Sequence, residues 1–152
     1  MKLRQLQDLP SLLTGKKVVL ANGCFDILHV GHLRYLQEAR TFGDVLVVAL
    51  NSDKSTRRIK EAGRPILTET ERVSLVSALR CVDHVVLFDE LDVSHVLEVL
   101  QPAIHAKGTD YTQQTVPERD RVLGYGGEVR IAGDPKDHST RGIIERICNR
   151  GL

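Results

Sequence analysis

Short aliphatic runs alternate along the chain with longer amphipathic stretches. The runs lie at residues 18–21, 45–50, 84–88, 103–106 and 128–132, and glycine, proline, asparagine or aspartate residues bound them. Continuous apolar runs of this length are typical of strands that are buried on both faces. The pattern therefore predicts five strands.

The stretches between these runs carry apolar residues at helical spacing. The clearest helix start is at Thr68 and Glu71, because their spacing fits a capping box. In the last stretch, Ile143, Ile144 and Ile147 are expected to face the core. Helices are predicted over residues 31–42, 68–79, 92–100, 116–125 and 139–148, and residues 1–14 are expected to add a short helix on the outside.

Strands that alternate with helices imply parallel strands joined by right-handed crossovers. The predicted fold class is therefore α/β, with a doubly wound, five-stranded parallel sheet that is Rossmann-like. A length of 152 residues suits one domain, residues 1–152, with residues 1–14 as its N-terminal extension. In such sheets ligands bind at the carboxyl ends of the strands, where the strand order reverses.

The composition of the chain argues against nucleic acid and membranes as partners. The chain has 21 Lys and Arg against 20 Asp and Glu, so its net charge of +1 provides no overall field for nucleic acid or an anionic membrane. The longest aliphatic run has six residues (45–50), whereas a membrane span needs about 20. Cys24, Cys81 and Cys148 are odd in number and far apart, which favours free thiols in a reducing cytosol. We therefore expect a cytoplasmic protein that binds neither nucleic acid nor membrane.

The end of the first predicted strand carries the candidate chemistry. It has neither the G-x-G-x-x-G of a dinucleotide site nor a P-loop, but His29-x-Gly31-His32 stands where the next helix begins. The two histidines lie on the same side of a helical turn, and Gly31 lets a ligand approach the backbone. Together with the free N–H groups of a helix start, they form a site for an oligophosphate. A zinc site would need a third ligand, and none stands nearby in the sequence.

The run Gly23-Cys24-Phe25-Asp26-x-x-His29-x-Gly31-His32 resembles the signature of the cytidylyltransferase-like nucleotidyltransferase superfamily. The resemblance extends over roughly residues 15–150. Later segments, among them Asn51-Ser52-Asp53, 107–111 and Ser139-Thr140, are similar to the adenylyltransferase domain of bacterial ADP-heptose synthase. The resemblance implies transfer of AMP from ATP to D-glycero-β-D-manno-heptose 1-phosphate, which gives ADP-heptose and pyrophosphate.

The resemblance also implies a role for each matching residue. His29, His32 and Lys60, a member of the basic segment 53–64, are expected to be catalytic. Asp26, Asn51, Asp53 and Arg72 are expected to contact the acceptor. The nucleotide site is expected to comprise Asn22, Gly23, Cys24, Phe25, His29, Gly31, His32, Lys107, Gly108, Asp110, Ser139 and Thr140. Mg²⁺ is expected to bridge the phosphates, with no protein ligand assigned to it.

The residues alone also permit simpler roles. Asp26 and Ser139 are good helix caps, and Arg72 could be a charge on a helix surface. His84 and His105 fall within predicted strands and His95 on a helix surface, so no function is predicted for these three.

Other functions of the same site stay open. The enzymatic alternatives are a cytidylyltransferase that uses CTP and glycerol 3-phosphate and an adenylyltransferase that acts on FMN. The non-enzymatic alternative is a nucleotide-binding regulatory module. By analogy with the family we expect a homodimer, and we expect the sugar kinase that makes the acceptor to be a separate polypeptide.

Overall fold

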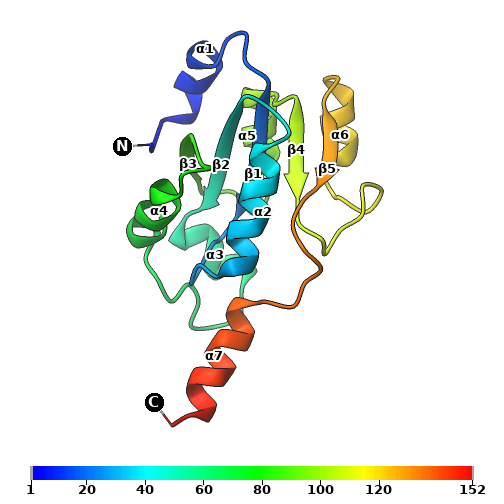
Figure 1. Ribbon diagram of the computed structural model, residues 1–152. Coiled ribbons are helices and arrows are strands. Elements are labelled where there is room, and N and C mark those ends of the chain that lie inside the picture. The colour runs from blue at the N-terminus through cyan, green and yellow to red at the C-terminus, as the bar shows by residue number, and fades with distance from the viewer. Residues whose placement is uncertain (1, 152) are drawn as a thin grey trace.

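The computed structural model describes residues 2–151, so Met1 and Leu152, the two ends of the predicted domain, lie outside it. One all-parallel sheet has the strand order β3-β2-β1-β4-β5 (Figure 1), which confirms the predicted fold class. Its strands are β1 (Val18–Gly23), β2 (Val45–Asn51), β3 (His84–Phe88), β4 (Ile104–Lys107) and β5 (Glu128–Ile131).

The strand order reverses between β1 and β4. From β1 the chain moves outward to β2 and β3, and it then returns to place β4 on the other side of β1, where Val19 pairs with Ile104. Crossovers that leave in opposite directions from two neighbouring strands open a crevice at their carboxyl ends. The topology therefore locates a binding site at the ends of β1 and β4.

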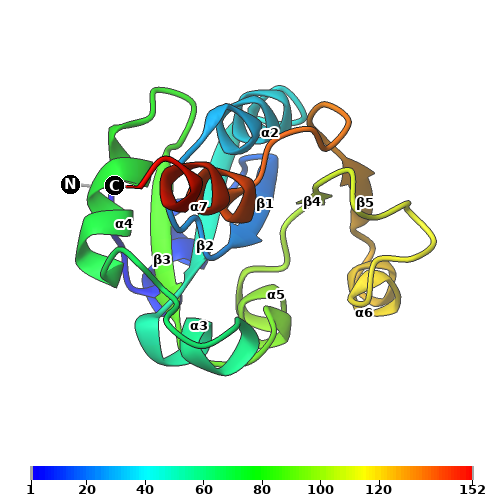
Figure 2. The same cartoon turned by 90° about the horizontal axis from the view of Figure 1, so that it is seen from below.

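Helices cover both faces of the sheet. Helices α2 (Val30–Arg40) and α4 (Glu69–Ala78) lie on one face, and α5 (Ser94–Leu100) and α6 (Arg119–Gly124) lie on the other (Figure 2). Because strand side chains alternate, Val19 of β1 packs into the core on one face and Leu20 into the core on the other. The capping box predicted at the start of α4 is present, since Thr68 N donates to Glu71 Oε2 at 2.8 Å.

The N-terminal segment forms the predicted short helical piece, divided between a 3₁₀ turn, η1 (Leu6–Asp8), and α1 (Leu9–Leu12). Leu9 is fully buried and belongs to the core under α5. Before it, Leu3 forms a parallel bridge to Val85 at the edge of the sheet. The segment thus covers an edge strand that would otherwise be exposed.

One helix was not predicted. Residues Asp53–Ile59 form α3, which Ser52 caps by accepting a hydrogen bond from Ser55 N at 3.1 Å. Charged residues dominate this segment, so it has no apolar stripe from which a helix could be predicted.

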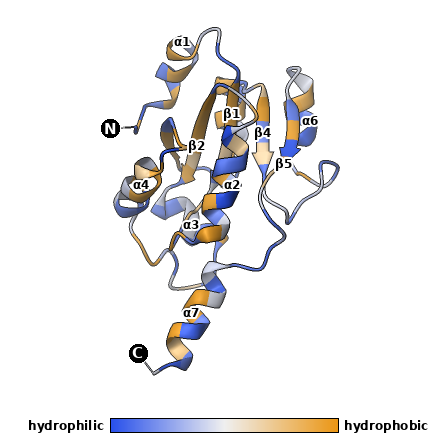
Figure 3. Ribbon diagram, in the orientation of Figure 1, coloured by the Kyte–Doolittle hydropathy of each residue, from blue (hydrophilic) through white to orange (hydrophobic). Residues whose placement is uncertain are grey.

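Helix α7 (Thr140–Asn149) departs from the prediction in its surroundings. It projects beyond the carboxyl end of the sheet, with its apolar residues visible along its length (Figures 1 and 3). None of its residues is buried, and Ile147 is 45% exposed. The prediction that Ile143, Ile144 and Ile147 face the core was therefore wrong, because the chain after β5 runs to the carboxyl end of the sheet and the helix projects beyond it. Within residues 2–151, no helix has both the length and the apolarity needed to cross a bilayer.

Candidate active site

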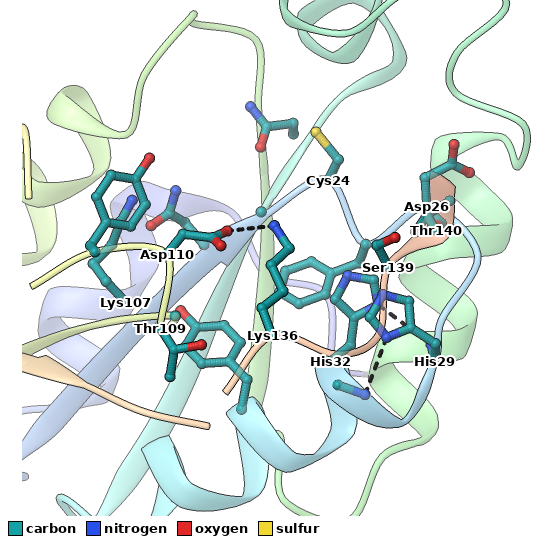
Figure 4. Close-up of a pocket in the computed structure, with 18 of the residues that line it drawn as sticks. Cys24, Asp26, His29, His32, Lys107, Thr109, Asp110, Lys136, Ser139 and Thr140 are labelled. Carbon is teal, nitrogen blue, oxygen red and sulfur yellow. Dashed lines mark hydrogen bonds and ion pairs between the residues drawn. The ribbon is translucent and has the colours of Figure 1, made fainter. Parts of the chain in front are cut away.

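A cleft of about 590 Å³ opens at the carboxyl ends of the strands. Its volume lies in the range of small-molecule sites, and it contains the crevice between β1 and β4. Every residue proposed for the site from the sequence lines this cleft except Asp53 and Arg72. Figure 4 shows that the labelled residues come from the end of β1, the start of α2, the loop after β4 and the start of α7.

His29 and His32 stand together at the start of α2. Their rings are stacked, with centroids 3.8 Å apart and planes 23° apart. His29 is the N-cap, and its Nδ1 accepts a hydrogen bond from Gly31 N at 3.1 Å. Nδ1 of His32 in turn accepts one from His29 N at 3.4 Å. The two side chains thus perform the roles of the usual capping box.

These hydrogen bonds determine where each ring carries its proton. A neutral imidazole has one N–H, and since Nδ1 is the acceptor in both rings, the proton lies on Nε2. Burial is the largest cause that lowers the pKa of His32, and together with the neighbouring His29, Lys60 and Lys136 it brings that pKa to about 3. Burial also lowers the pKa of His29, with His138 and Lys136 adding to the effect. Both rings are therefore neutral donors through Nε2 at neutral pH.

The structure gives Gly31 a packing role beside the predicted one. A Cβ at this position would lie 3.0 Å from Cε1 and Nδ1 of His29, and 3.4 Å from Cβ of His138. Such contacts are too close for a well-packed side chain. The missing side chain therefore makes room for the His29 ring, and Gly31 itself lines the cleft.

The turn before His29 is strained. Phe25 and Ile27 have φ angles of 51° and 54°, in the left-handed region that a β-branched residue rarely occupies. Each such residue costs on the order of 1–3 kcal/mol and persists only where its surroundings enforce it. Strain of this kind concentrates at functional sites. Here the strained turn joins the end of β1 to the start of α2, where the two histidines lie.

Asp26, between these two residues, holds the turn to a distant segment. Its carboxylate accepts hydrogen bonds from Arg64 Nε at 2.6 Å, Ile66 N at 2.8 Å and Leu67 N at 3.0 Å. Burial raises the pKa of Asp26, but the backbone bonds and Arg64 outweigh it and hold that pKa below its usual value. Asp26 thus lines the cleft, but both of its carboxylate oxygens already accept hydrogen bonds from within the chain. It does not cap a helix.

Arg72 and Asp53, which we expected to contact the acceptor, lie outside the cleft. The Arg72 side chain is fully buried and donates to Cys24 O at 2.6 Å and Asn51 O at 2.8 Å. It also pairs with Asp53 at 2.7 Å. Arg72 therefore joins the ends of β1 and β2 to α3 from beneath, which is neither of the two roles predicted for it.

A charged cluster lines the cleft on the side of β4. The Nζ of Lys107 lies 3.7 Å from Glu118 Oε2 and 4.8 Å from the ring centroid of Tyr111. Burial lowers the pKa of Lys107, although Glu118 opposes that shift. Beside this pair, Lys136 Nζ donates to Asp110 Oδ2 at 2.7 Å, as the dashed line in Figure 4 shows.

The start of α7 completes the cleft. Ser139 caps this helix by accepting from Gly142 N at 3.0 Å, and Thr140 Oγ1 donates to Asp26 O at 2.6 Å. Both hydroxyls therefore have partners within the chain. The contact from Thr140 also ties the start of α7 to the strained turn, so two helix starts meet at one site.

Lys60 and Asn51 line the cleft from the β2 side. Lys60 follows α3, and its charge is one of those that lower the pKa of His32. Asn51 is buried, and its Nδ2 donates to Ser55 Oγ at 2.9 Å. Of the two residues, only Lys60 carries a positive charge that acts on His32.

The side chains of the cleft indicate which groups would hold a Mg²⁺ ion. Within residues 2–151, no group of three or more His, Cys, Asp or Glu side chains could hold a metal ion. Two carboxylates of the cleft already have partners, since Asp26 accepts three N–H bonds and Asp110 pairs with Lys136. This arrangement fits a Mg²⁺ ion whose ligands are mainly phosphate oxygens and water.

Five basic residues that line the cleft were not assigned to the site from the sequence: Arg34, Arg64, Lys136, His138 and Arg141. Lys136 and His138 stand just before Ser139, so a basic residue beside a helix start was an available signal. Arg34 stands one turn into α2 and pairs with Asp134 at 2.6 Å. That contact joins residues 100 positions apart, and no local pattern could indicate it.

Comparison with known proteins agrees with this geometry. The cytidylyltransferase-like family model matches residues 20–144. The bifunctional protein HldE of Geotalea uraniireducens is 53% identical over 133 residues, which are 88% of this chain and 27% of that protein. HldE of Syntrophotalea carbinolica is 51% identical over 136 residues, which are 90% of this chain and 28% of that protein. This chain thus spans little more than a quarter of the length of these curated relatives.

Two solved structures share the fold. The crystal structure of the lipopolysaccharide core biosynthesis protein from Thermoplasma volcanium has a TM-score of 0.64 and 34% identity, over 77% of this chain and 94% of that one. Pantothenate synthetase from Thermus thermophilus has a TM-score of 0.68 and 18% identity, over 94% of this chain and 67% of that one. At the latter identity the likeness shows the fold alone.

Proposed function

Since the chain belongs to the cytidylyltransferase-like family, we propose that it transfers AMP from ATP to a sugar 1-phosphate and releases pyrophosphate. The acceptor that we propose is D-glycero-β-D-manno-heptose 1-phosphate, and the product is ADP-heptose. The likeness to the HldE proteins, of which this chain spans little more than a quarter, supports that choice of acceptor.

One observation carries the proposal of nucleotidyl transfer. His29 and His32 are neutral imidazoles whose Nδ1 atoms are occupied by backbone N–H groups, so each has an Nε2–H donor at the mouth of a helix. Donors that are already oriented stabilise charge as it develops on phosphate oxygens, and need no reorganisation during the reaction. Lys60 and Lys136 add positive charge beside them.

The reaction needs no nucleophilic side chain. A phosphate oxygen of the acceptor attacks the α-phosphorus of ATP in line and forms a new P–O bond. The bond from that phosphorus to the bridging oxygen breaks, and its electron pair leaves with pyrophosphate. The protein contributes alignment of the two phosphates and donors for the charge on the non-bridging oxygens, which are His29 and His32 together with the backbone N–H groups at the start of α7.

Mg²⁺ is proposed to enter with ATP. When bound, it neutralises part of the triphosphate charge. The carboxylates Asp26 and Asp110 are held by other residues of the chain, so the triphosphate is the main source of its ligands.

The test is an assay of pyrophosphate release that crosses ATP, CTP, GTP and UTP with heptose 1-phosphate, glycerol 3-phosphate and FMN. We expect release only with ATP and heptose 1-phosphate in the presence of Mg²⁺, and its loss when EDTA is added. Release only with CTP and glycerol 3-phosphate would overturn the choice of substrates but keep the chemistry. Binding of ATP without release from any pair would favour the regulatory module.

A further inference from the structure

A buried histidine that the proposed reaction does not use lies directly beneath the cleft. His105 stands in the middle of β4, paired in register with Leu20 of β1 and Val129 of β5, and its side chain is fully buried. A polar ring at such a position carries a desolvation penalty unless both nitrogens find partners. An aliphatic side chain would meet no such penalty there, so the ring calls for an explanation.

The single hydrogen bond of this ring reaches a residue of the cleft. His105 Nε2 lies 2.9 Å from Asn22 Oδ1, at the end of β1. Asn22 lines the cleft, whereas His105 does not. Within residues 2–151, Nδ1 of His105 is buried and has no hydrogen-bond partner. The ring therefore makes its one polar contact with the side chain of Asn22.

This contact determines which way the Asn22 amide faces. Because Oδ1 can only accept, Nε2 of His105 must carry the ring proton, and the orphaned Nδ1 is a bare acceptor. Burial lowers the pKa of His105 to about 3, so the ring stays neutral with a single N–H. The alternative tautomer would bury an unpartnered N–H, which native structures avoid. With Oδ1 turned toward the ring, the Asn22 side chain makes no other hydrogen bond within residues 2–151, and since Asn22 lines the cleft, Nδ2 is left for a ligand there.

We propose that His105 is a positioning residue, which orients the Asn22 amide so that Nδ2–H donates to an acceptor oxygen of the bound nucleotide. The inference rests on the proposed function for the identity of the ligand, and on the His105–Asn22 contact for the role of the ring. Asn22 is the residue that touches the ligand, and His105 acts only through it.

The test uses the full chain with five variants: Asn22→Ala, His105→Leu, His105→Gln, the Asn22→Ala/His105→Leu double variant and Val129→Ala. His105→Leu should lower kcat/KM for ATP about tenfold, the scale for losing a residue that orients a ligand-contacting group. His105→Gln keeps an N–H donor for Oδ1 and should recover most of the activity. The double variant should be no worse than Asn22→Ala alone, because the two residues act as one unit.

Val129→Ala is the matched control for packing. Val129 is buried beside His105 in the next strand and does not line the cleft. This variant should lose stability and keep kcat/KM. If His105→Leu still lowers kcat/KM tenfold in the Asn22→Ala background, His105 does not act through Asn22 and the proposal is overturned.

A second measurement separates this proposal from the proposed reaction. In ¹⁵N-labelled protein, the side-chain NH₂ resonances of Asn22, identified by their loss in Asn22→Ala, are followed as ATP and Mg²⁺ are added without acceptor. We expect them to shift on binding in the wild type, and to shift much less in His105→Leu. Resonances that do not move on addition of ATP overturn the role of Asn22 and His105. Failure of pyrophosphate release with every substrate pair overturns the reaction alone.

Discussion

The side chain of His29 caps the helix on which His32 stands, and His32 in turn accepts a hydrogen bond from the backbone of His29. The same two contacts begin α2 and place both ring protons on Nε2. The contacts that cap the helix are therefore the same contacts that orient the two Nε2–H donors. If these histidines have the proposed catalytic role, a substitution at either one should change both stability and turnover, unless the new residue can still cap the helix.

Two substitutions of His29 separate capping from catalysis. His29→Ala should lower the free energy of unfolding by about 1 kcal/mol, the usual effect of losing an N-cap, and lower turnover roughly 10²–10⁴-fold. His29→Asn keeps a strong N-cap residue and should restore stability, but not turnover, because the amide is shorter than the ring. Urea unfolding and pyrophosphate release measure the two effects. Wild-type turnover in His29→Asn would show that the imidazole is not the donor.

The lowered pKa values of His29 and His32 predict the pH profile of kcat. The pKa of His32 is about 3 and that of His29 lies below 6.5, so both rings keep their neutral, Nε2–H form on the alkaline side of these values. These histidines should therefore add no acid limb between about pH 6.5 and about pH 8, where an unperturbed histidine titrates. The measurement is kcat at saturating substrates across that range. An acid limb there that disappears in His32→Asn would contradict the assigned neutral state.

His32 and His105 should make the fold sensitive to acid. Both have a pKa of about 3 in the folded protein, against an ordinary value of 6.5. Below pH 6.5 the unfolded chain takes up protons that the folded chain does not, so the free energy of unfolding falls as the pH falls toward 3. Above pH 6.5 their contribution is fully retained. Urea unfolding at a series of pH values should show a shallower slope for His105→Leu than for the wild type.

Arg72 should matter for stability and not for contact with the acceptor. Arg72→Met removes the donors to Cys24 O and Asn51 O and leaves Asp53 without its partner. Breaking a buried pair in this way should lower the free energy of unfolding by about 3–5 kcal/mol, whereas Arg58→Met, on the exposed side of α3, should change it by less than about 0.5 kcal/mol. Chemical denaturation measures both. A raised KM for the acceptor in folded Arg72→Met at low temperature, without loss of stability, would restore the predicted contact of Arg72 with the acceptor.

Lys136 should bind nucleotide without stabilising the fold. It lines the cleft, and its ion pair with Asp110 leaves both side chains about half exposed. Exposed pairs contribute less than about 1 kcal/mol, so Lys136→Ala should unfold like the wild type. Loss of its positive charge beside the histidines should raise the KM for ATP several-fold, with a weaker dependence on salt. Lys54→Ala, which breaks the exposed pair with Asp89 outside the cleft, is the matched control and should leave the KM unchanged.

Local patterns sufficed for much of the fold. All five strands lie where the short aliphatic runs predicted them, and the capping box at Thr68 and Glu71 has the expected contacts. These features depend on residues that are neighbours in sequence, so their spacing carries the information. Helix α3 escaped prediction for the same reason, because its charged residues have no apolar period.

The features of the site also fall into two groups: those that follow from the sequence and those that only the tertiary structure shows. That His29 and His32 face one helix start follows from their spacing, and so does the location of a ligand cleft at the strand ends. Only the tertiary structure decided that Asp26 is held by Arg64 and the backbone of residues 66 and 67. It also decided that Arg72 lies beneath the cleft and that His105 reaches Asn22. These contacts join residues far apart in the chain, and one side chain fits several partners equally well until packing brings one of them within hydrogen-bond distance.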